Sequence, residues 1–305
     1  MKKIFKLLPF FLLSLDVLGQ TGPIPSEYQF NPVLINPACA GNRDALNLAA
    51  FYRNQWVSIK GAPVTMTFSV DAPISNEKIG LGLLISSDRI GVTKENNLVT
   101  SYAYKINIGD GYLSMGLAAG VTLTSTNYSD LVVLDPTDEI YLSSSRVFVI
   151  PSFSFGLYYT YHDFFTGFSL PKLLASDFDF GKNKYVLSFK PAQYNYLLTA
   201  GNNFALNSKI RLLPSFLVDY LPGAKIQFDL NTQAGLLNKY FIGISYRNNR
   251  SMVGMLQLQI NNQFRLGYSY DFELSTLGSF SNGSHEIMLR YEFRYKLNAV
   301  SPLNL

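Results

Sequence analysis

Residues 113–124 read LSMGLAAGVTLT, in which apolar residues at the odd positions alternate with small or polar residues at the even positions. The same period of two runs through residues 64–72 (VTMTFSVDA) and residues 285–295 (HEIMLRYEFRY). Successive side chains of a β-strand point to opposite faces, so the pattern predicts strands with one apolar face and one polar or small face. A membrane β-barrel is built from such strands, with lipid on one side and a polar lumen on the other.

About fourteen segments of this kind can be placed along the chain, an even number as expected for a single-chain bacterial barrel. We expect strands to begin near residues 45, 64, 79, 98, 112, 147, 164, 194, 210, 225, 241, 252, 264 and 285. The sequence therefore predicts an all-β fold, a transmembrane outer-membrane antiparallel β-barrel over residues 45–297, with residues 298–305 as a C-terminal tail.

The lengths of the connections support a barrel. If the mature N-terminus is periplasmic, the odd-numbered connections face outside, and these include the two longest, residues 127–146 and 170–193. The even-numbered connections are mostly short. Long outside loops and short periplasmic turns are typical of outer-membrane barrels.

The composition fits the same fold. Charged residues make up 15% of the chain, against about a quarter in soluble domains, while Tyr and Phe number 20 and 23. The net charge of +4 is too weak a bias to predict a nucleic-acid partner.

Residues 1–19 have the features of a cleaved signal peptide. Lys2, Lys3 and Lys6 form a basic region, an apolar stretch follows, and residues 17–19 precede Gln20 as a cleavage site. The apolar stretch is shorter than the roughly twenty residues that a membrane-spanning helix needs. We therefore expect export to the outer membrane of a Gram-negative bacterium.

Residues 20–44 contain four prolines, which disfavour a helix. This segment is either a periplasmic arm or a plug inside the lumen. It carries Cys39, the single cysteine of the chain, so an internal disulfide is excluded.

Arg53, Gln55 and Trp56 stand at the end of the first predicted strand. A buried charge needs a partner, and Asp271 and Glu286 lie on neighbouring predicted strands near the outer rim. The structural explanation is an Arg53 side chain that faces the lumen and pairs with a carboxylate across the closure of the barrel, with Trp56 in the outer aromatic girdle. The functional explanation is a recognition site at the outer rim.

No catalytic or cofactor site is expected. Ser284, His285 and Glu286 invite comparison with a hydrolase, but the G-x-S-x-G elbow is missing, and His162 falls in a turn on the opposite side. The carboxylates of residues 130–139 lack the spacing of a calcium loop, so a solvated outer loop is the simpler interpretation. The sequence shows neither a phosphate loop nor a Cys/His metal cluster.

Four short signatures indicate a family: INPACAG at residues 35–41, YRNQW at 52–56, GYSYD at 267–271 and GSHEI at 283–287. Their order and spacing resemble the PorP/SprF family of type IX secretion membrane proteins of Bacteroidetes, from about Tyr28 to about Phe293. Cys39 departs from the family, which usually has an aromatic residue there. The motif residues are Asn36, Pro37, Ala38, Gly41, Arg53, Gln55, Trp56, Gly267, Tyr268, Tyr270, Asp271, Gly283, His285 and Glu286.

The resemblance implies an outer-membrane component of the secretion and gliding apparatus that is not an enzyme. Its expected partners are a large secreted surface protein, such as an adhesin, and periplasmic parts of the machine. Phe178, Phe180 and Tyr185 lie among charged residues in the connection 170–193, as interface anchors do, and are the candidate partner-binding residues. Alternatively, this connection folds inward and constricts the lumen.

A second functional hypothesis is a channel for hydrophobic small molecules, like the FadL-type barrels. Such a channel should carry an N-terminal hatch that plugs the lumen. Residues 20–44 are short for that role.

Overall fold

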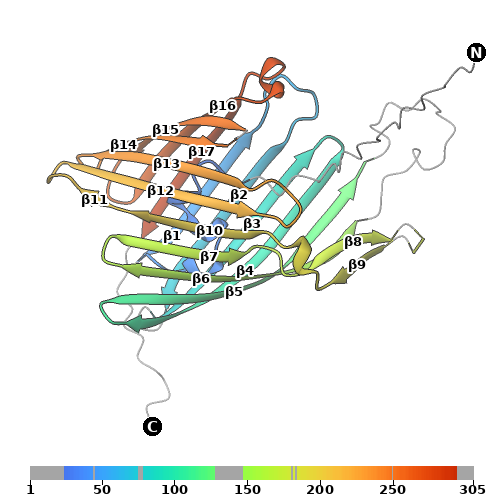
Figure 1. Ribbon diagram of the computed structural model, residues 1–305, viewed down its shortest axis with the longest axis horizontal. Coiled ribbons are helices and arrows are strands. Elements are labelled where there is room, and N and C mark those ends of the chain that lie inside the picture. Colours follow the sequence, from blue (N-terminus) through green and yellow to red (C-terminus); the bar gives the residue numbers. More distant parts are fainter. Residues whose placement is uncertain are drawn as a thin grey trace, which may run out of the picture.

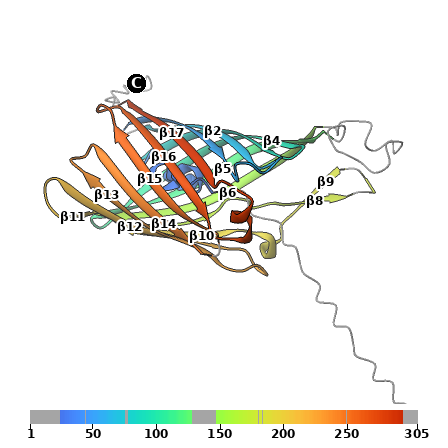
Figure 2. The same cartoon turned by 90° about the horizontal axis from the view of Figure 1, so that it is seen from above.

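The computed structural model describes residues 24–43, 45–74, 78–127, 147–179, 181–182, 184–248 and 250–293. Within these residues, fourteen antiparallel strands form a closed barrel (Figures 1 and 2), which confirms the predicted fold class. The barrel strands are β1 (Leu46–Asn54), β2 (Val64–Ile74), β3 (Ile79–Ile90), β4 (Thr93–Ile108), β5 (Gly111–Thr126), β6 (Phe148–Tyr161), β7 (Phe164–Leu170), β10 (Tyr196–Asn202), β12 (Ile210–Tyr220), β13 (Gln227–Leu236), β14 (Tyr240–Arg247), β15 (Ser251–Gln259), β16 (Phe264–Glu273) and β17 (Ser284–Phe293).

The first and last strands meet, because β1 pairs with β17 along its whole length, from Leu46 opposite Phe293 to Asn54 opposite His285. On the far side of the ring, β10 pairs with both β7 and β12. The two-residue strand β11 (Phe204–Ala205) adds to the end of β12, and β8 (Ala175–Asp179) and β9 (Lys184–Ser188) form a separate hairpin.

Most predicted strand starts lie within two residues of the observed ones. The exception is β4, expected from residue 98 and observed from Thr93. Residues 93–97 are TKENN and show no apolar alternation, but their backbones pair with β3 and β5, which both extend to this height. Tertiary pairing here overrides a weak local signal.

The two ends of the barrel differ. At one end, here called the loop end, lie the connections 55–63 and 274–283, the β8–β9 hairpin, the end of β5 and the start of β6. The other end, the turn end, has short connections such as 109–110 and 162–163. Gly109 (φ +59°) and His162 (φ +51°) supply the left-handed backbone that two-residue hairpin turns require.

The two faces of the wall follow the sequence alternation. On β5, Leu117 points outward and is 60% exposed, while Ser114 points into the lumen and is buried. Large apolar side chains also lie on the outside of the other strands, as a wall in contact with lipid requires. No helix among the described residues is long and apolar enough to cross a membrane.

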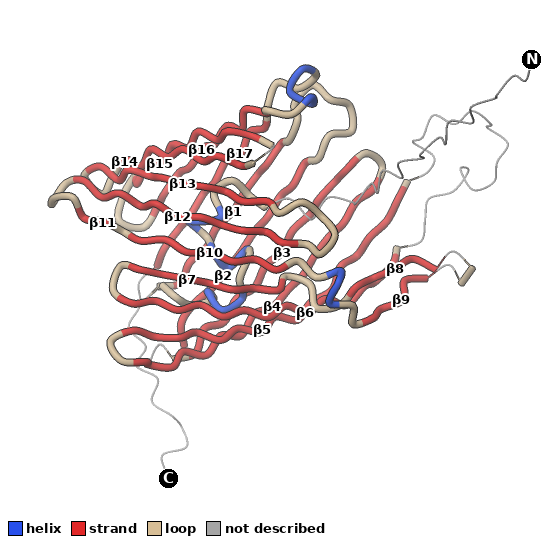
Figure 3. Tube along the Cα trace, viewed as in Figure 1, coloured by secondary structure: helices blue, strands red, loops and turns tan. Residues whose placement is uncertain are grey.

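Residues 24–43, here called the lumen segment, lie inside the ring of strands (Figure 3). The segment forms three single-turn 3₁₀ helices, η1 (Tyr28–Phe30), η2 (Pro32–Leu34) and η3 (Pro37–Cys39). Pro32 and Pro37 stand at helix starts, where the missing N–H costs nothing. Tyr28 and Ile35 pack on Leu197 and Leu217 of the wall. The prolines that disfavour a long helix thus suit a compact segment of short turns.

Candidate functional site

Arg53 lies at the centre of a buried ionic cluster where the barrel closes. Its guanidinium is 2.6 Å from Asp271 on β16 and 3.0 Å from Glu286 on β17. Glu286 is the cross-strand partner of Arg53 in the β1–β17 register. The structure therefore brings together the three charged residues that the sequence placed near one rim, with all three side chains at most 5% exposed.

The lumen segment completes this cluster. Ser26 Oγ accepts a hydrogen bond from Arg53 (2.8 Å) and donates one to Asp271 (2.8 Å). The backbone N–H groups of Ser26 and Glu27 both donate to the Glu286 carboxylate, each at 2.9 Å. Arg53 and Glu286 thus bind the lumen segment as well as each other.

A second arginine extends the cluster around the lumen. Arg247 on β14 bonds Asp229 (2.9 Å), approaches Asp271 (3.4 Å) and donates to the carbonyl of Pro25 (3.3 Å). Burying such charges lowers the free energy of unfolding unless each charge keeps its ion-pair and hydrogen-bond partners. Ser26, Asp229 and Arg247 were not predicted from the sequence. Asp229 and Arg247 are charged residues at the lumen-facing positions of an apolar alternation, which is the signal that could have found them.

The motif at residues 35–41 binds the lumen segment to strands of the wall away from the ionic cluster. Asn36 donates to the carbonyls of Leu157 (3.0 Å) and Phe168 (3.3 Å), and its Oδ1 caps η3 at the Ala38 N–H. Gly41 adopts φ +64° and donates to Asp71. The motif thus contacts strands β2, β6 and β7.

Glycines of the wall allow this close approach. A Cβ on Gly116 would lie 2.2 Å from the Ala38 nitrogen, and one on Gly267 would lie 2.4 Å from the Glu27 carboxylate. Pro37, Ala38 and Cys39 are buried in this contact. The family glycine at position 267 therefore makes room for the lumen segment.

Two loops form a cap over the closure, which we call the loop-end cap (residues 55–63 and 274–283). Val57 donates to the carbonyl of Gly283 (2.9 Å), and Asn282 donates back to Val57 (2.8 Å). Trp56 (φ +46°) donates its indole N–H to Glu273 at 3.1 Å. The indole is thus tied to the end of β16, and the expected position of Trp56 in the outer aromatic girdle stays a prediction.

The remaining motif residues lie around the cap. Gln55 is buried, and its backbone N–H donates to Pro63 (2.9 Å). Gly283 (φ +79°) makes the turn into β17. Tyr268 and Tyr270 point outward and contact His285, whose Nδ1 lies 2.8 Å from the Tyr268 hydroxyl.

The geometry argues against a hydrolase at Ser284 and His285. Ser284 is buried on the lumen face and accepts a hydrogen bond from the Trp56 N–H, whereas His285 faces outward. Neighbouring residues on a strand point to opposite faces, so the hydroxyl cannot reach the imidazole. Within the described ranges, no group of three His, Cys, Asp or Glu residues could hold a metal ion. Residues 130–139, which were considered as a calcium-binding loop, lie outside the residues that the structure describes.

Two of the candidate partner-binding residues, Phe178 and Tyr185, lie on the β8–β9 hairpin beside the loop end (Figure 1). Phe178 and Tyr185 pack on each other and on Phe148, with ring centroids 5.1–5.4 Å apart. Phe180 is outside the described residues. The apolar residues that the hairpin region exposes are instead Val186, Leu187 and Phe189, the last at 79%.

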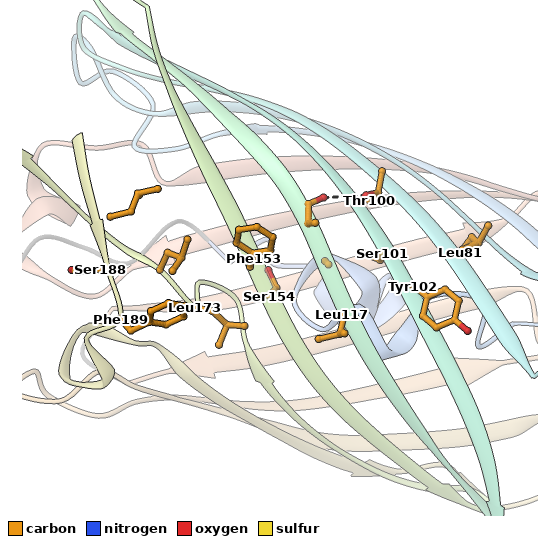
Figure 4. A pocket seen from close by; sticks show the side chains of 14 residues that line it. Leu81, Thr100, Ser101, Tyr102, Leu117, Phe153, Ser154, Leu173, Ser188 and Phe189 are labelled. Carbon is orange, nitrogen blue, oxygen red and sulfur yellow. Dashed lines mark hydrogen bonds between the residues drawn. The ribbon is translucent and has the colours of Figure 1, made fainter. Parts of the chain in front are cut away.

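An apolar groove of about 860 Å³ runs along the outer wall beside this hairpin (Figure 4). Thr100, Leu117 and Phe153 line it on the strands of the wall. Leu173 and Phe189, from the connection that carries the hairpin, close one end.

The family model for "Type IX secretion system membrane protein PorP/SprF" matches residues 17–291, which is most of the chain. The chain belongs to this family. PorP/SprF is a family of secretion-system membrane proteins rather than of enzymes. No curated protein matches the chain.

The chain is similar to several solved structures at low sequence identity. The monoaromatic hydrocarbon channel CymD matches with a TM-score of 0.50 and 13% identity, over 87% of this chain and 93% of that one. The outer membrane protein Omp33 of Acinetobacter baumannii matches at 0.48 and 8%, over 82% and 98%. The KdgM porin matches at 0.39 and 8%, over 81% and 99%. The CymD likeness shows the fold of this PorP/SprF protein and says nothing about its cargo.

Proposed function

We propose that this PorP/SprF protein resides in the outer membrane of a Gram-negative bacterium after cleavage of residues 1–19. There it helps to secrete a large adhesin-like protein or holds that protein at the cell surface. The turn end contacts periplasmic parts of the machine, and the loop end meets the secreted partner. Family membership supports the setting, and the occupied lumen supports a binding role.

The observation that carries this proposal is the lumen segment. Its residues Ser26, Glu27 and Asn31 are almost completely buried and bond to the wall on several sides. A segment held by buried hydrogen bonds to charged and polar wall residues obstructs free diffusion through the barrel. A rigid wall that positions its loops is the arrangement that recognition sites use.

The partner-binding surface is proposed to be the region of the β8–β9 hairpin, with Phe178, Phe180 and Tyr185 shaping it. Aromatic residues next to charges are typical anchors of protein interfaces. Phe178 and Tyr185 hold the hairpin against Phe148, so they support the surface from beneath while Phe189 and Val186 are exposed on it.

Deleting residues 177–184 tests this proposal. The variant should still insert and run faster on a gel unheated than boiled, but intact cells should lose one secreted protein from their surface. As a matched comparison, Phe189→Ser at the loop end should reduce retention, and Leu237→Ser at the turn end, also strongly exposed, should not. An unchanged surface proteome in the deletion variant would refute a role for the hairpin.

A channel for hydrophobic small molecules is the second candidate, and the apolar groove favours it. The purified wild-type barrel, reconstituted in a planar bilayer, is the test. The secretion proposal expects no stable conductance steps, because the lumen segment fills the barrel. The channel would be favoured if the variant that lacks residues 177–184 keeps the normal set of surface proteins but no longer takes up hydrocarbons.

A further inference from the structure

The direction of the lumen segment determines on which side the chain enters the barrel. Its first described residue, Ile24, lies among residues at the loop-end termini of the strands, including Asp219, Gln227 and Asn248. The next residue, Pro25, accepts a hydrogen bond from Arg247, the last residue of β14. The segment therefore begins at the loop end.

The other end of the segment lies at the turn end. The carbonyl of Gly41 accepts a hydrogen bond from Lys105 near the end of β4, at 2.8 Å. Arg43 forms an ion pair with Glu292 near the end of β17. β1 then begins at Leu46 and returns toward the loop end.

The segment packs closely against the wall. Ser26 and Glu27 are at most 1% exposed, and a Cβ on Gly116 of β5 would lie 2.2 Å from the Ala38 nitrogen. With residues 1–19 cleaved, as proposed, only residues 20–23 precede Ile24, and at about 3.5 Å per residue they are too short to run back along the barrel, whose strands β4 and β5 have 16 residues each.

We propose that the polypeptide preceding Ile24 leaves the barrel at the loop end, so that the mature N-terminus lies among the long loops. This inference rests on the proposed function for the statement that the loop end faces outside. On that basis the mature N-terminus is at the cell surface, contrary to the periplasmic N-terminus assumed above, and it belongs to the surface that meets the secreted partner.

The ionic cluster keeps this arrangement in place. Reversing the segment would strip Glu286 of the Ser26 and Glu27 N–H groups and Arg247 of the Pro25 carbonyl. Unpaired buried charges are strongly unfavourable, so the segment is fixed in one direction. The N-terminal end is therefore a permanent part of the loop-end surface.

Epitope tags at three positions test the inference in cells that carry the full chain. One tag is inserted directly before Ile24, a second after Asn282 in the loop-end cap and a third after Asn262 in a turn-end connection; Asn282 and Asn262 are both exposed. Folding of each variant is checked by its faster migration when unheated. Antibody binding is then compared on intact and on permeabilised cells.

We expect antibodies to bind the tags at Ile24 and Asn282 on intact cells. The tag at Asn262 should be bound only after the cells are permeabilised. Binding at Ile24 together with Asn262, and not with Asn282, would overturn the inference. If Ile24 and Asn282 are reached only after permeabilisation while Asn262 is reached on intact cells, the shared side is supported and the outward orientation in the proposed function fails. A single cysteine inserted directly before Ile24 and labelled with a membrane-impermeant maleimide repeats the measurement with a one-residue insertion, since Cys39 is buried.

Discussion

The lumen segment and the β8–β9 hairpin are both additions to the same barrel, yet they are held in different ways. The lumen segment bonds to strands on all sides of the lumen, through buried contacts such as Arg53 to Ser26, Asn36 to Leu157 and Ser169 to Ile35. The hairpin is a two-stranded sheet of its own, and its rings of Phe178 and Tyr185 pack on Phe148 of the barrel.

The lumen segment is therefore a structural element, whereas the β8–β9 hairpin is a surface whose sequence can vary. Many buried polar contacts make the lumen segment part of the cooperative core, because losing one partner leaves others unsatisfied. An isolated hairpin with few buried contacts is at most marginally stable by itself. Its sequence can vary without damage to the barrel, which suits a region that recognises a particular partner.

The largest effect is expected from Arg53→Ala. The change leaves Asp271 and Glu286 buried without their main partner, at a cost of roughly 3–5 kcal/mol in the free energy of unfolding. Urea unfolding of the barrel in detergent micelles, followed by the loss of the fast-migrating unheated form, measures it. Arg89→Ala is the control, because Arg89 is exposed on β3, and its change should stay within about 0.5 kcal/mol. Equal effects of the two variants would contradict a stabilising role for the cluster.

A smaller effect is expected from Gly116→Val. The new side chain would overlap the backbone of Pro37 and Ala38, so the lumen segment or β5 must shift. Overpacking of this kind costs about 1–3 kcal/mol. The same unfolding measurement applies, with Gly254→Val as the matched control, since a Cβ at Gly254 meets nothing within 4 Å. If both glycines tolerate valine, the lumen segment is not packed against β5.

The smallest effect on the barrel is expected from Phe178→Ala. It removes one member of the ring cluster with Phe148 and Tyr185, and aromatic pairs contribute about 0.5–1.5 kcal/mol. Because the hairpin is outside the barrel, the urea midpoint of the barrel should remain unchanged while protease cleavage within 175–188 becomes faster. A drop in the barrel midpoint as large as that of Gly116→Val would show that the hairpin and the barrel unfold together.

The sequence alone was sufficient for the wall of the barrel. In segments such as 113–124 the alternation is local, and the need to present lipid with one face and the lumen with the other leaves little choice of structure. The motif at 52–56 and the carboxylates at 271 and 286 likewise indicated a charge cluster, because a lumen-facing arginine requires a partner.

Only the tertiary structure decided the course of the lumen segment and the shape of the loop-end cap. No periodicity marks residues 24–43, whose short turns are specified by contacts with strands more than a hundred residues away, such as Asn36 with β6 and Ser26 with Glu286. The position of Trp56 has a similar origin, since its indole bonds Glu273 from the other end of the chain. Local alternation can be read from neighbouring residues, whereas a segment that fills a lumen takes its conformation from the wall around it.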